Sequence, residues 1–164
     1  MSLELGGKSP TIVFDDADIE VALAGILFGV FSSTGQSCIA DKRIIVVDDV
    51  HDRFVERLVE RVDALRVGDP MDPGTQLGPL AREDLRATLA DQVARTVDAG
   101  ARCLRGGGPN DGPGWFYPPT VLVDVAPGMP AFDDETFGPV AAVIRADDTR
   151  DALALANLST FGLG

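Results

Sequence analysis

Short runs of β-branched residues alternate along the whole chain with longer segments of helical apolar spacing, and this alternation constrains the fold most. Thr11–Phe14 and Ile44–Val47 are short, nearly continuous apolar runs, which is typical of strands covered on both faces. Each is followed by apolar residues at helical spacing, from Ile19 to Val30 and from Phe54 to Leu65. Strands that alternate with helices predict an α/β fold, a mostly parallel sheet with helices on both faces.

The rest of the chain continues this pattern. We expect a helix over Leu85–Val97 that ends at Gly100, since glycine suits a left-handed helix C-cap. The helix from Ile19 is apolar on one side and small on the other, so we expect it to be nearly buried and to end near Ser32–Gly35. Further elements are expected as strands over Arg102–Leu104, Thr120–Val125 and Pro139–Arg145, a surface loop over Gly106–Gly114, and a helix over Asp151–Asn157 capped by Asp148 or Thr149.

Composition narrows the class of protein. A chain of 164 residues, 45% of them hydrophobic, is sufficient for one domain with a core of its own. The formal net charge of -12 opposes binding to a phosphate backbone, so we expect no nucleic-acid partner. The longest apolar run, Val21–Phe31, is much shorter than the roughly 20 residues of a membrane span. No secretion signal is recognisable, and we expect a cytoplasmic protein without a membrane partner and without a disulfide.

Cys38 is the strongest candidate for a reactive group. Its neighbours in TGQSCIA are small or polar, which favours a thiol that faces a cleft, whereas a lone cysteine is often an inert buried residue. Cys103, in a short strand, fits the inert interpretation. His51 beside Asp52 at a helix start is expected to be solvated, neither a metal ligand nor a base for a cysteine. If Cys38 is a nucleophile, its base must be a carboxylate, for which Glu4 is the candidate.

Two other segments can be explained either by a functional role or by local structure alone. The GKS of LELGGKSP suggests a phosphate loop, but that motif requires a glycine where Ser2 stands and a helix where Pro10 and a strand follow. The phosphate-loop interpretation is therefore rejected. The segment FDDETFGPV, which contains Glu135, is by itself consistent with an acidic solvated loop that enters a strand.

Taken together, LELGGKSP, GQSC and ETFGPV resemble the three signature segments of the aldehyde dehydrogenase superfamily in order and spacing. The resemblance runs from Leu3 to the last residue, because TIVFDDADIEVA, GPL, FYPPTVL and ANLSTFGLG also resemble family segments. FYPPTVL, GMPAFDDETFGPVAA and GQSCIADKR look closest to the succinate-semialdehyde dehydrogenase branch. One departure is Ser33, where members commonly carry an asparagine.

The resemblance implies a role for each matching residue. Cys38 would attack the aldehyde carbon and form a thiohemiacetal and then a thioester, and its backbone N–H would form half of an oxyanion hole. Glu4 would activate the water that hydrolyses the thioester. Glu135 would bind the nicotinamide ribose of NAD or NADP, and Phe137 would pack beside the ring. Gly6 matches a glycine that lets cofactor and substrate approach the backbone.

The resemblance also implies an extent and a setting. Residues 1–164 would be a truncated catalytic domain, with the dinucleotide-binding domain before it and a C-terminal segment after it absent. The substrate would be a small aldehyde, succinic semialdehyde by the branch, and the assembly a homo-oligomer. We expect no NAD(P) reduction by this chain alone, because it lacks most cofactor contacts. Two alternatives are a cofactor-independent thiol esterase and an inactive, self-associating unit.

Overall fold

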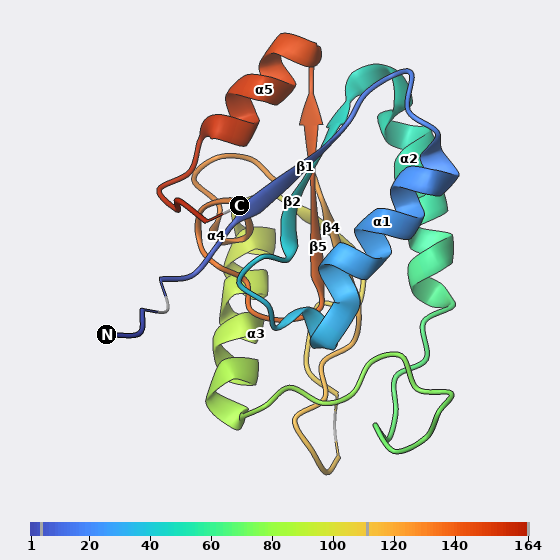
Figure 1. The fold of residues 1–164 in the computed structure, drawn as a ribbon, viewed down its shortest axis with the longest axis vertical. Coiled ribbons are helices and arrows are strands. Elements are labelled where there is room, and N and C mark those ends of the chain that lie inside the picture. The colour runs from blue at the N-terminus through green and yellow to red at the C-terminus, as the bar shows by residue number, and fades with distance from the viewer. Residues whose placement is uncertain (4, 111, 164) are drawn as a thin grey trace.

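The fold is described from a computed structural model that covers residues 1–3, 5–110 and 112–163. It is an α/β sandwich with one central sheet (Figure 1). In chain order the elements are β1 (Ser9–Val13), α1 (Ile19–Phe31), a 3-10 turn η1 (Ser32–Gly35), β2 (Asp41–Val47), α2 (Asp48–Asp63), α3 (Glu83–Asp98), β3 (Arg102–Arg105), β4 (Thr120–Val123), α4 (Pro130–Asp133), β5 (Val140–Ala146) and α5 (Thr149–Asn157).

The five strands of the sheet lie in the order β1-β2-β5-β4-β3. β1, β2, β5 and β4 are mutually parallel, and only β3 at the edge runs antiparallel to its neighbour β4. The predicted mostly parallel sheet is therefore confirmed. β1 and β5, which are far apart in the sequence, flank β2 on either side, and this arrangement decides where the candidate site forms.

Helices cover both faces of the sheet, as predicted. α1 and α2 lie on one side, and α3, α4 and α5 on the other (Figure 1). Alternation along β2 supplies both cores: Ile44 and Val46 pack among the residues of α1 and α2, whereas Ile45 and Val47 join the core on the opposite face. A strand buried on both faces has no place for alternating polar residues, which explains the continuous apolar run in the sequence.

The helix ends predicted at Asp148 and Gly100 are confirmed in the structure, which also shows a cap at Asp18. Asp18 caps α1, and its side chain accepts hydrogen bonds from the amides of Glu20 and Val21. Asp148, one of the two predicted caps, performs this role for α5. Gly100 has a φ of 115°, in the region that favours glycine after a helix. The short helix α4 has no counterpart among the predicted elements.

The prediction that the helix from Ile19 is nearly buried is wrong. In α1, Leu23 and Ile26 are buried against the sheet, but Val21 and Phe28 are 70% and 77% exposed. A single helix on a sheet can bury only the side that faces the strands, although its sequence is apolar on nearly all sides. Within the described ranges, no helix is long and apolar enough to cross a membrane.

Candidate active site

The three segments singled out in the sequence each lead directly into one of three neighbouring strands. Gly7 lies just before β1, Cys38 just before β2, and Glu135 in the loop that enters β5. Because these strands are adjacent and parallel, their amino ends meet at one edge of the sheet. The segments are thus brought together although Gly7 and Glu135 are 128 positions apart.

The turn before Cys38 has an uncommon backbone. After α1 the chain passes through Ser33, Thr34 and Gly35 with φ values of 51°, 56° and 70°, all in the left-handed region. A non-glycine residue loses roughly 1–2 kcal/mol there, so tertiary contacts must hold the turn. Gln36 supplies one of them, because its Oε1 accepts a hydrogen bond of 3.0 Å from the amide of Ala81.

Two glycines of the first segment contact the other two segments. At Gly7 a Cβ atom would overlap the carbonyl oxygen of Cys38, so the backbones of the first and second segments are in direct contact. At Gly6, with a φ of 73°, a Cβ atom would lie 2.9 Å from Oε2 of Glu135. The amide of Gly7 donates a hydrogen bond of 2.9 Å to Oε1 of the same carboxylate. Glu135 is therefore held against the first segment.

Cys38 borders two cavities. One, of about 590 Å³, is also lined by Glu135 and Phe137, and its remaining lining residues are Gly6, Gln36, Ser37, Leu85 and Thr88. The other, of about 660 Å³, is lined mainly by apolar side chains and backbone, namely by Leu3, Leu5, Gly6, Thr160, Phe161, Gly162 and Leu163 besides Cys38. Cys38, which is half-buried, thus lies between one cavity lined by a carboxylate residue and an aromatic residue and another that is mainly apolar. This arrangement agrees with the expectation that Cys38 faces a cleft.

Glu4, the predicted base, lies outside the described residues. Its neighbours in the sequence, Leu3 and Leu5, line the second cavity beside Cys38.

A cluster of buried basic residues beneath this edge of the sheet was not predicted. Burial lowers the pKa of Lys8 to about 7, and the nearby charges of Lys42 and Arg43 add to this effect. The ammonium of Lys8 donates to Oγ1 of Thr136 at 3.3 Å. The only signal in the sequence was a lysine and an arginine directly before the apolar run Ile44–Val47 of β2.

Arg43 forms hydrogen bonds both to the segment before β1 and to the end of α5. Its guanidinium donates hydrogen bonds of 2.9 to 3.0 Å to the carbonyl groups of Leu155, Ala156 and Leu158, and its Nε donates to the carbonyl of Lys8 at 3.1 Å. Burial lowers the pKa of Arg43 from its ordinary value.

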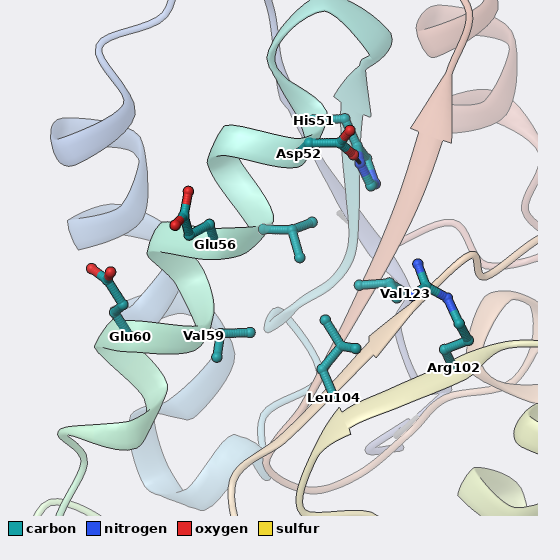
Figure 2. Close-up of a pocket in the computed structure, with 9 residues that line it drawn as sticks. His51, Asp52, Glu56, Val59, Glu60, Arg102, Leu104 and Val123 are labelled. Carbon is teal, nitrogen blue, oxygen red and sulfur yellow. Dashed lines mark hydrogen bonds and ion pairs between the residues drawn. The ribbon is translucent and has the colours of Figure 1, made fainter.

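The prediction that His51 is solvated is wrong. Its side chain is 2% exposed, because it lies on the side of α2 that faces the sheet, while Asp52 one position later is exposed. Nδ1 lies 3.0 Å from Oδ1 of Asp52, and Nε2 has no hydrogen-bond partner in the described part of the chain. Figure 2 shows this histidine at one end of a groove between α2 and the strands that carry Arg102 and Val123. The groove does not include Cys38.

Cys103, in the edge strand β3, differs from Cys38 in its surroundings. Its Sγ donates to the carbonyl of Arg105 at 3.1 Å, and burial raises the pKa of its thiol. A raised pKa lowers the thiolate fraction, which agrees with the expectation that this cysteine is inert. Among the residues that the structure describes, no group of three or more His, Cys, Asp or Glu side chains could hold a metal ion.

Comparison with solved structures shows which class of enzyme shares this fold. A succinate-semialdehyde dehydrogenase from Burkholderia pseudomallei superposes with a TM-score of 0.94 at 37% identity, covering 98% of this chain and 33% of that one. Lactaldehyde dehydrogenase from Escherichia coli superposes with a TM-score of 0.92 at 40% identity, covering 95% and 33% of the two chains. The aldehyde dehydrogenase fold expected from the sequence is therefore confirmed, over about a third of the length of each of these structures.

The sequence comparisons then identify the family. The profile of the aldehyde dehydrogenase family matches residues 1–164, and the chain belongs to that family. It is 51% identical to the NADP(+) succinate-semialdehyde dehydrogenase of Mycobacterium avium over 162 residues, which is 99% of this chain and 34% of that enzyme. The corresponding enzyme of Mycobacterium tuberculosis is 50% identical over 99% of the chain. The chain spans about a third of the length of the curated relatives that it matches.

Proposed function

We propose that this chain provides the catalytic centre of an NAD(P)-dependent aldehyde dehydrogenase and that Cys38 is its nucleophile. The observation that carries the proposal is the meeting of three separate segments at one cavity, through the contacts of Gly7 with Cys38 and with Glu135. On this proposal residues 1–164 correspond to most of the catalytic domain. The names of the relatives support succinic semialdehyde as substrate and NADP as cofactor.

The chemistry of Cys38 follows from its thiol and its place between two cavities. The thiolate adds to the aldehyde carbon and forms a thiohemiacetal, and the backbone N–H of Cys38 stabilises the oxyanion. Loss of hydride from that carbon leaves a thioester. Addition of water then releases the carboxylic acid and returns the thiolate, which is a good leaving group. The resemblance to the family assigns activation of this water to Glu4.

The wall of the first cavity fits the nicotinamide end of the cofactor. Phe137 offers an aromatic surface, and the carboxylate of Glu135, anchored by the amide of Gly7, can accept a hydrogen bond from a ribose hydroxyl. Gly6 leaves the space that a side chain would fill beside Glu135. A nicotinamide ring held there would supply the acceptor for the hydride that leaves the substrate carbon.

A second candidate function is thiol-dependent ester hydrolysis without a cofactor. The observation that favours it is that Cys38 also borders the apolar cavity, which is lined by neither Glu135 nor Phe137. A small activated ester entering there needs only the thiol and water.

Alkylation with iodoacetamide followed by peptide mapping tests the role of Cys38. We expect Cys38 to be alkylated much faster than Cys103 in the folded chain, and equal labelling or earlier labelling of Cys103 would refute the proposal. In parallel, p-nitrophenyl acetate hydrolysis is measured for Cys38→Ala, with Cys103→Ala as the matched control. We expect slow hydrolysis that only Cys38→Ala abolishes.

Absorbance at 340 nm with succinic semialdehyde and NADP tests the dehydrogenase reaction of this chain. We expect no detectable reduction, because Glu135 and Phe137, the groups proposed to contact the cofactor in the first cavity, would contact only its nicotinamide end. Reduction that disappears in Cys38→Ala would show that the chain suffices for the whole reaction.

A further inference from the structure

Lys42 joins the segment that carries Cys38 to the loop that carries Glu135 and Phe137. It lies at the start of β2, and its side chain is 0% exposed. Nζ donates a hydrogen bond of 2.6 Å to the carbonyl of Gly35 and another of 2.9 Å to the carbonyl of Gly138. Gly35 precedes Cys38 by three positions, and Gly138 directly follows Phe137.

The two loops touch at the point where Lys42 binds them. A Cβ atom at Gly35 would overlap the carbonyl group of Gly138 and lie 2.9 Å from the nitrogen of Pro139, so the backbones are in van der Waals contact. Each carbonyl oxygen is only an acceptor, and neither can bond the other. A buried ammonium can donate to both at once, and a charge-assisted hydrogen bond is roughly twice as strong as a neutral one.

We propose that Lys42 is a positioning residue that clamps the Cys38 turn to the Gly138 loop and so sets the thiol against the wall formed by Glu135 and Phe137. The purpose assigned to the clamp rests on the function proposed above. The clamp itself rests on the two hydrogen bonds and the close approach of the loops.

The burial of this lysine argues against a passive role. Burial lowers the pKa of Lys42 to about 8, while Glu135 and Asp41 act in the opposite direction. An apolar side chain would avoid the unfavourable burial of a charge, but it would leave the carbonyl of Gly35 in the interior without a donor. The carbonyl of Gly138 would keep only its hydrogen bond of 2.8 Å from the amide of Val140. The buried position of the ammonium is explained by its two hydrogen bonds, one to the carbonyl of each loop.

Hydrogen exchange measured by mass spectrometry on the chain and on Lys42→Met tests the clamp. We expect exchange to rise about tenfold or more in peptides that cover 33–38 and 135–139, with smaller changes in α2. Leu58→Ala is the control, since this buried residue belongs to the core between α1, α2 and the sheet, and its loss lowers stability without removing a donor from either loop. In Leu58→Ala we expect the rise to be largest in α2.

A spectroscopic signature separates the clamp from general loosening. The carbonyl ¹³C resonance of Gly35, observed through the amide of Gln36, should shift in Lys42→Met and stay in place in Leu58→Ala. Lys42→Gln keeps two N–H donors on a shorter side chain, so its exchange in both loops should lie between the wild type and Lys42→Met, and it provides the measurement if Lys42→Met does not fold.

The proposal is overturned if removal of the ammonium leaves both loops as protected as in the wild type. It is also overturned if Lys42→Met raises exchange in α2 as much as in the loops. Neither readout depends on a reaction at Cys38. A wild-type chain whose Cys38 is unreactive would therefore refute the proposed function while the exchange data still decide the clamp.

Discussion

Replacement of Gly35 by alanine tests whether close contact between the Cys38 turn and the Gly138 loop holds the candidate site together. Two effects add at this position. With a φ of 70°, Gly35 occupies the left-handed region, where alanine loses roughly 1–2 kcal/mol. The new methyl group also overlaps the carbonyl of Gly138, and its other near neighbour is backbone, so no side chain can rotate away.

The two effects can be separated with a matched glycine. Gly100 has a φ of 115°, and a Cβ atom there would meet nothing within 4 Å, so Gly100→Ala carries the backbone strain alone. We expect Gly100→Ala to lower the free energy of unfolding by about 1–2 kcal/mol. Gly35→Ala should lower it by about 2–5 kcal/mol, because forced displacement of packed atoms adds roughly 1–3 kcal/mol.

Urea unfolding followed by far-UV circular dichroism measures both losses. Iodoacetamide labelling of the folded variants then reports on Cys38, whose preference over Cys103 should fall in Gly35→Ala and persist in Gly100→Ala. Equal losses of stability in the two variants, or unchanged labelling in Gly35→Ala, would contradict the inferred loop contact.

Three further predictions concern the same edge of the sheet. Ser33→Asn should raise the free energy of unfolding by about 0.5 kcal/mol, because asparagine adopts the left-handed conformation of this residue, φ 51°, more readily than serine. A lower free energy of unfolding in urea would contradict this effect of replacing the family's asparagine by serine. Gly7→Ala should displace the carbonyl of Cys38 and lower stability by about 1–3 kcal/mol, with loss of selective Cys38 labelling; retention of both would contradict the contact. The pKa of Lys8 is lowered from 10.5 to about 7 in the folded chain. Between about pH 7 and 10.5 the lysine is therefore mostly neutral in the folded chain and protonated in the unfolded chain, so the free energy of unfolding should rise with pH over this range. Urea unfolding at about pH 7, 8 and 9 measures the rise, which should be smaller in Lys8→Met, and an identical pH dependence in both proteins would refute the role of Lys8.

The sequence by itself determined the elements and most of their ends. Local chemistry carries this information: β-branched runs such as Ile44–Val47 form strands, and Asp18 and Gly100 mark helix ends through a side-chain cap and a left-handed φ. The resemblance to a family also predicted Cys38, Glu4 and Glu135 as site residues, because such motifs are recognised from the order of residues alone, without knowledge of the fold.

The tertiary structure decided which of these residues meet. Strand order is set by packing between distant segments. The order β1-β2-β5 makes the amino ends of these three parallel strands direct neighbours. The burial of His51 and the exposure of Phe28 followed from which side of each helix faces the sheet. Lys42 reaches the carbonyl groups of two loops that are 103 positions apart in sequence (138 − 35), so no local pattern could assign it.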